Sequence, residues 1–85
     1  MEYAVVAFRS RSHTIKFYNV TLSQGLRTEI VNTPKEAGVG CGLSVKCSLA
    51  DLARVKTAVR LSGLSSFAGV FSVKNVSGGR IVRSI

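Results

Sequence analysis

The sequence has few acidic residues, one proline, one histidine and two cysteines, and each shortage narrows what the chain can do. Only four Asp and Glu stand against twelve Lys and Arg, so the formal net charge is +8 at pH 7. This surplus favours polyanions or an acidic protein partner through long-range attraction, without choosing between them. A single proline and an apolar content of 46% are typical of a chain that folds.

A long hydrophobic stretch is also missing. The longest apolar run is Ala4–Phe8, far short of the roughly 20 residues that span a bilayer. The N-terminus does not have the basic and then apolar order of a signal peptide. We therefore expect a cytoplasmic protein that makes no membrane contact.

The side chains needed for several kinds of site are scarce. Two cysteines and His13 cannot complete a four-ligand zinc site, so neither a metal nor another cofactor is expected. The two thiols are expected to be reduced in the cytoplasm. There is no Ser/His/Asp set, carboxylate pair or phosphate-binding glycine motif, and His13 is typical of a solvated residue in a first helical turn.

The length of 85 residues is enough for one domain, residues 1–85, and not for two. A chain of this size buries only about 60 to 65% of the surface that it exposes when unfolded. We therefore expect no deep substrate cavity.

Several segments have the composition of β-strands. The first is a continuous apolar run, typical of a central strand covered on one or both faces. In the third, alternation with Leu43 and Val45 places Cys47 on the face that meets the helices. The turn of residues 77–79 allows a fifth strand. The predicted strands are Tyr3–Phe8, Arg27–Asn32, Leu43–Cys47, Val70–Val76 and, as an option, Arg80–Ile85.

Two other segments have helical periodicity. The first, Arg11–Gln24, has an apolar stripe of Ile15, Tyr18 and Leu22 with Phe17 alongside, and Gly25 is expected to end it. The second begins at a Ser48 cap and ends at Gly63, with a stripe of Leu49, Leu52, Val55 and Val59.

The predicted order β-α-β-β-α-β is that of the split βαβ pattern of a ferredoxin-like sandwich. We therefore expect an α+β fold in which both helices pack on one face of an antiparallel sheet. The optional C-terminal strand would extend this sheet.

Cys41 lies in the glycine-rich turn of residues 38–42, where a loop enters the third predicted strand. A thiol reacts as its thiolate, so something must stabilise the anion. Glycines permit positive-φ turns whose amide hydrogens point into a concavity, so the loop backbone is the expected source. A charge acting through water adds only about 1 kcal/mol at 4 Å, which makes Lys35, Lys46 or Arg9 a helper at best.

Each cysteine also has an alternative interpretation. A glycine-rich turn is a common feature, so Cys41 can occupy one without any chemical role. Cys47 is either a small hydrophobic residue of the core, which its alternation with Leu43 and Val45 favours, or a resolving thiol.

The residues Pro34, Lys35 and Glu36 are followed, after a short spacer, by Cys41, Gly42 and Leu43 at the start of a strand. This arrangement resembles a small bacterial and archaeal family described as selenium or sulfur carrier-like. In the family pattern, a Pro, a basic residue and a Glu precede a short spacer, and Cys-Gly-Leu or Cys-Gly-Met then leads into a strand. The chain departs from it at Lys35, where arginine is frequent, at Gly38 and Gly40, where small polar residues are usual, and at Cys47. The matching residues are Pro34, Lys35, Glu36, Cys41, Gly42 and Leu43.

The resemblance implies a carrier that accepts sulfur or selenium on Cys41 as a persulfide or selenosulfide and passes it to an acceptor protein. The donor would be a protein such as a cysteine desulfurase. Such a chain acts stoichiometrically, as a carrier more than as an enzyme. The supporting loop comprises Pro34, Lys35, Glu36, Gly40, Gly42 and Leu43.

A basic module that binds nucleic acid or protein without thiol chemistry is the alternative. The positive charge and an open sheet face would suit RNA. Stacking recognition, however, needs aromatic side chains on the central strands, and Leu43–Cys47 contains none. A phosphate-only interaction remains, with a steep salt dependence as its test.

Overall fold

The strand β1 (Glu2–Phe8) lies at the centre of an antiparallel sheet with the order β2-β3-β1-β4-β5. The structure is a computed structural model that describes all 85 residues. Residues 4–8 are fully buried, which confirms the central strand predicted from the apolar run. The other strands are β2 (Glu29–Asn32), β3 (Leu43–Cys47), β4 (Phe67–Val76) and β5 (Gly79–Ser84).

Two strands, β2 and β4, begin at residues other than those predicted, because pairing with a neighbouring strand sets where a strand begins. β2 begins two residues later than expected and β4 begins three residues earlier, because Phe67 still pairs with Phe8 across a register shift in β1. The fifth strand is formed, and it pairs with β4 from Val76↔Gly79 to Phe71↔Ser84.

The helices are α1 (Arg11–Ser23) and α2 (Leu52–Ser62), and short 3-10 turns occur at η1 (Lys35–Ala37) and η2 (Leu49–Asp51). The predicted Ser48 cap is present, although the turn that it caps is η2, which leads into α2. The Ser48 hydroxyl accepts a hydrogen bond from the Asp51 amide at 3.3 Å. Gly63 ends α2 in the left-handed conformation, with φ 64°, as expected for a C-terminal glycine. Neither helix is long and apolar enough to cross a membrane.

The buried face of α1 differs from the predicted one. Ile15 and Leu22, two members of the apolar stripe, are each 45% exposed. Tyr18 of the stripe packs against the core, and Phe17 beside it is fully buried. The other two fully buried side chains of the helix are Thr14 and Thr21, which the apolar pattern did not indicate. Threonine is tolerated there because its hydroxyl can bond to a carbonyl one turn earlier in the helix, which satisfies the buried polar atom.

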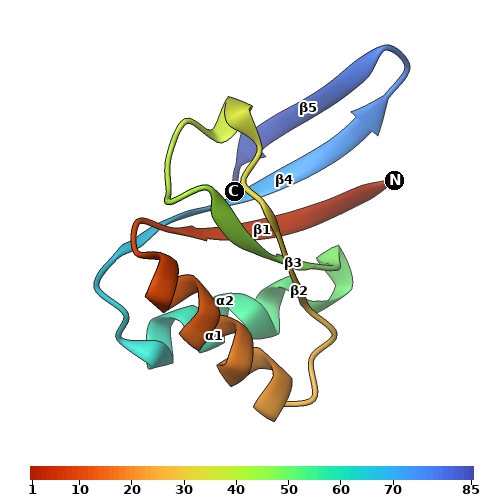
Figure 1. Cartoon of the computed structure of the whole chain (residues 1–85). Coiled ribbons are helices and arrows are strands. Elements are labelled where there is room, and N and C mark those ends of the chain that lie inside the picture. The colour runs from red at the N-terminus through yellow and green to blue at the C-terminus, as the bar shows by residue number, and fades with distance from the viewer.

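The sheet separates two apolar clusters. Figure 1 shows both helices on the same side of the sheet. The larger cluster joins both helices to one face of the sheet and includes Phe8, Phe17, Val45, Cys47 and Val55. The smaller cluster lies on the other face and contains no helical residue: Val5, Ala7, Phe71 and Val73 are its buried members. The chain therefore has an α+β fold with two helices and a five-stranded antiparallel sheet.

Candidate functional site

The loop of residues 33–42, which joins β2 to β3, forms the candidate site. Its ends are closed by a hydrogen bond from the Thr33 amide to the Gly42 carbonyl at 2.9 Å, one step beyond the last β2–β3 pair. Gly38, Gly40 and Gly42 have φ angles of 66°, 97° and 94°. The positive-φ turns predicted for these glycines are therefore confirmed. They return the chain to the sheet after η1 (Figure 1). Ala37 and Val39 of this loop pack against the smaller apolar cluster.

Cys41 is anchored to the end of the central strand. Its amide donates a hydrogen bond to the Phe8 carbonyl at 3.0 Å. A Cβ atom on Gly40 would lie 3.3 Å from the same carbonyl oxygen, tighter than an ordinary van der Waals contact. Glycine at position 40 therefore permits both the positive φ and the close approach that holds Cys41 where β1 ends and α1 begins.

Two polar atoms lie within hydrogen-bond range of the Cys41 Sγ atom. They are the Thr14 hydroxyl at 3.6 Å and the Leu43 carbonyl at 3.7 Å. No amide of the glycine-rich loop is among the hydrogen-bond partners of the sulfur, although the sequence favoured such amides, and the amide of Cys41 itself donates to Phe8. Helix α1 supplies the hydroxyl instead, and the sulfur lies beside the first turns of that helix.

Thr14 was not a candidate in the sequence, because the apolar stripe indicated a different face of α1. It is fully buried, and its hydroxyl lies 3.3 Å from the Ser10 carbonyl and 3.4 Å from the Leu43 carbonyl. No sequence signal marks a threonine in this role, since only helix packing brings it to a cysteine 27 residues away.

The residues singled out by the family resemblance are spread around the loop. Pro34 is buried, Leu43 is half-buried, and Lys35 and Glu36 are exposed. Three residues that match the family pattern, Pro34, Lys35 and Gly42, line an open hollow beside Cys41, although Cys41 itself does not line it. The hollow is lined by Thr33, Pro34, Lys35, Gly38, Val39, Gly40 and Gly42.

Glu36 ties the loop to β5. Its carboxylate accepts two hydrogen bonds from the Arg80 guanidinium, at 2.8 and 2.9 Å. These bonds lower the pKa of Glu36 from 4.5 to about 2. Sequence reasoning did not foresee this pair, because Arg80 lies 44 residues away on a strand that was only optional.

We expect the Glu36–Arg80 pair to stabilise the fold in a pH-dependent way. Since the pKa of Glu36 is lower in the folded than in the unfolded state, its contribution is complete above about pH 4.5 and is lost as the pH falls toward 2. Glu36→Gln should therefore lower the melting temperature slightly at pH 7 and less at lower pH. The effect is small because both side chains are more than one-third exposed.

Thermal unfolding of the wild type and Glu36→Gln, followed by circular dichroism between pH 7 and pH 2, checks this prediction. Arg80→Gln is the matched control, since it removes the same pair from the other side. A gap in melting temperature that stays constant across this range would contradict the assignment.

Cys47 lies in the core, as its position on the same face of the strand as Leu43 and Val45 predicted. It is only 2% exposed, and burial, followed by the nearby Asp51 carboxylate, raises its pKa to about 11. The thiol is therefore protonated at neutral pH and shielded from large reagents. Both properties favour the core interpretation over the resolving-thiol interpretation.

The imidazole of His13 has Ser66 as its hydrogen-bond partner. Its Nδ1 atom lies 2.6 Å from the Ser66 hydroxyl, which also accepts a hydrogen bond from the Ser10 amide at 3.2 Å. The residue is half-buried rather than fully solvated, which corrects the sequence-based expectation. No three His, Cys, Asp or Glu side chains converge in a group that could hold a metal ion.

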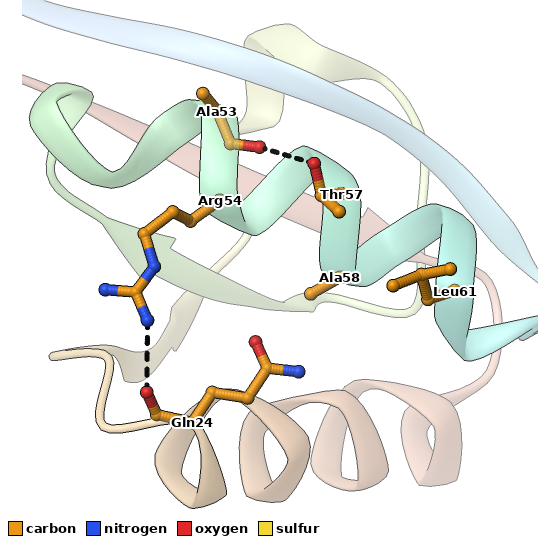
Figure 2. Close-up of a pocket in the computed structure, with 6 residues that line it drawn as sticks. All are labelled: Gln24, Ala53, Arg54, Thr57, Ala58 and Leu61. Atoms are coloured by element: carbon orange, nitrogen blue, oxygen red, sulfur yellow. Dashed lines mark hydrogen bonds between the residues drawn. The ribbon is translucent and has the colours of Figure 1, made fainter.

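A groove between α2 and the C-terminal end of α1 is separate from this site (Figure 2). The Arg54 guanidinium bridges it by donating to the Gln24 carbonyl at 3.2 Å. None of its lining residues belongs to the Cys41 loop. They are Gln24, Ala53, Arg54, Thr57, Ala58 and Leu61.

The comparison with known families gives one match. Residues 3–66 match the family described as "Putative Se/S carrier protein-like". The matched segment runs from β1 to the end of the turn after α2, so it includes Cys41 and Thr14 and leaves out β4 and β5. No curated protein and no solved structure matches the chain.

Proposed function

Because the chain belongs to this family of Se/S carrier-like proteins, we propose that it carries sulfur or selenium on Cys41 as a persulfide or selenosulfide. The observation that carries the proposal is the contrast between the two cysteines. Cys41 is partly accessible and is anchored at the end of β1, whereas Cys47 is buried with a pKa of about 11. Only Cys41 combines access with a defined position.

The proposed transfer is an exchange between sulfur atoms without net oxidation. The Cys41 thiolate attacks the outer sulfur of a persulfide on a donor protein, for example a cysteine desulfurase. A bond forms between Sγ and that sulfur, the donor's S–S bond breaks, and its electron pair stays on the donor as a thiolate. Attack by an acceptor thiolate on the outer sulfur then returns Cys41 to its starting state. Selenium would follow the same route as the outer atom.

The surroundings of Cys41 support this chemistry. The sulfur lies next to the N-terminal part of α1, where the helix dipole favours negative charge. An accessible loop on a rigid sheet also allows donor and acceptor to reach the same atom in turn. The absence of an enclosed cavity around Cys41 suits a carrier whose reaction is completed by its partners.

The charge of the surface indicates the kind of partner. Only two of the twelve basic side chains, Lys46 and Arg80, pair with a carboxylate. The remaining positive charge would speed the encounter with an acidic donor or acceptor protein. We propose that these encounters take place in the cytoplasm, where the thiol stays reduced.

We also interpret the fold as a ferredoxin-like sandwich of one domain. The order β2-β3-β1-β4 and the two helices fit that topology, and β5 extends it beyond β4. The extension matters for the site because Arg80 of β5 holds the Cys41 loop through Glu36.

The proposal is tested by loading the protein with sulfur. Reduced protein is incubated with a cysteine desulfurase and cysteine, and the intact mass is measured for the wild type, Cys41→Ser and Cys47→Ser. We expect one added sulfur atom on the wild type and on Cys47→Ser, and none on Cys41→Ser. Cys47→Ser is the matched control, because it removes a thiol while leaving the site untouched.

Two results would contradict this proposal. Sulfur on Cys41→Ser would place the chemistry elsewhere. No sulfur on any variant, and no selenium from a donor protein that carries it as a selenosulfide, would favour a basic module that binds nucleic acid or protein. Steep loss of polyanion binding with added salt would then be the expected signature of that alternative.

A further inference from the structure

The buried face of α1 brings a hydroxyl to the sulfur of Cys41, and we propose that Thr14 is a catalytic residue that donates a hydrogen bond to the anionic sulfur. This inference rests on the proposed carrier function, and it assigns the group that stabilises the thiolate before attack and after delivery. It replaces the loop amides that the sequence suggested.

The geometry of the resting thiol leaves the hydroxyl free to change partner. The Cys41 thiol donates to the Leu43 carbonyl at 3.7 Å, while the Thr14 hydroxyl has carbonyl acceptors at Ser10 and Leu43, at 3.3 and 3.4 Å. Both hydroxyl distances are long for an O–H···O bond, whose usual length is about 2.7 to 2.8 Å. The carbonyls therefore satisfy the buried hydroxyl through long, weak hydrogen bonds, which the proton can exchange for a better acceptor.

Loss of the thiol proton changes which acceptor is best. The sulfur becomes an anion, which accepts a stronger hydrogen bond than a neutral carbonyl does. The Thr14 oxygen already lies 3.6 Å from Sγ, so rotation about its C–O bond is enough to direct the proton toward the sulfur. The pre-placed donor needs no movement of the helix or the loop.

Burial makes this donor effective. Thr14 is fully buried, so water does not compete for its hydroxyl, and a hydrogen bond in such surroundings is stronger than one in solvent. Cys41, in contrast, is half-buried and can still be reached by a partner. Thr14 thus stabilises the anion from its inner side, and the outer side remains free for the incoming sulfur.

The test compares Thr14→Val with Thr14→Ser, both in a Cys47→Ser background so that Cys41 is the only thiol. Valine keeps the shape of threonine without the hydroxyl, and serine keeps the hydroxyl. The rate of alkylation by iodoacetamide is followed by intact mass from pH 6 to pH 11. At pH 7 we expect Thr14→Val to react about tenfold more slowly than the parent and Thr14→Ser to react at nearly the parent rate. The difference in rate between the variants should shrink as the pH rises.

A merely structural role would give a different pattern. Equal rates for Thr14→Val and the parent at every pH would overturn the inference, and so would an equal loss in Thr14→Ser and Thr14→Val. Sulfur loading of the parent by the desulfurase is measured in parallel. Sulfur uptake without an effect of Thr14 on alkylation leaves the carrier proposal standing and rejects this one. An alkylation profile that depends on the hydroxyl, without sulfur uptake, would support the role of Thr14 and contradict the carrier proposal.

Discussion

Phe17→Ala is expected to lower the free energy of unfolding by about 3 to 5 kcal/mol, the usual cost of removing a buried aromatic ring. Phe17 is fully buried at the centre of the inner face of α1, and its ring lies 5.3 Å from that of Phe8, measured between centroids. The ring therefore fastens α1 to the end of the strand that also holds Cys41. A domain of this size has a total stability of only about 5 to 10 kcal/mol, so the loss is a large part of it.

Urea unfolding followed by circular dichroism measures this loss. Phe67→Ala is the matched control, because Phe67 also contacts Phe8, at 6.0 Å between centroids, but is 38% exposed. It should cost clearly less. If Phe17→Ala does not fold, the milder Phe17→Leu still reports the ranking. Equal decreases in the free energy of unfolding for the variants at positions 17 and 67 would mean that Phe17 does not anchor α1 to the sheet.

Gly40→Ala is expected to damage the site more than Gly42→Ala, although the two glycines have nearly the same backbone conformation. Their φ angles are 97° and 94°, so alanine meets similar strain at each position, of about 1 to 3 kcal/mol. The surroundings differ. A Cβ atom at position 40 would lie 3.3 Å from the Phe8 carbonyl, whereas one at position 42 would have no atom within 4 Å. Only Gly40→Ala should therefore disturb the bond between the Cys41 amide and Phe8.

The pair of variants separates strain from contact. Both the free energy of unfolding and the rate of Cys41 alkylation at pH 7 are measured for each variant. We expect similar losses of stability from strain, a further loss in Gly40→Ala, and a changed alkylation rate in Gly40→Ala alone. Indistinguishable behaviour of the two variants would show that the close approach to Phe8 does not position Cys41.

Much of the fold could be predicted from local patterns. The apolar run of residues 4–8 predicted the central strand, and the alternation of Leu43, Val45 and Cys47 predicted both β3 and the burial of Cys47. The glycines predicted to end α2 and to turn the loop before β3 do have positive φ angles, at Gly63 and in residues 38–42. These features depend on backbone conformation and on side-chain period within a few residues, which is information that the sequence displays directly.

The orientation of α1 could not be predicted in the same way. Its apolar stripe indicated the side of Ile15 and Leu22, while the sheet contacts the side of Thr14 and Phe17. The hydrophobic pattern of this helix is weak, because two of its three buried residues are threonines whose hydroxyls are satisfied by backbone carbonyls. Packing of the large Phe17 ring against Phe8 decided between the two sides.

The sequence by itself determined the class of fold, the central strand, the turn that presents Cys41 and the family to which the chain belongs. Only the tertiary structure decided what surrounds the sulfur. Thr14 and Cys41 are 27 residues apart, and Glu36 and Arg80 are 44 residues apart. Such contacts arise when the helix docks and the fifth strand pairs, and those events depend on the packing of the whole chain. No local pattern of residue types encodes them.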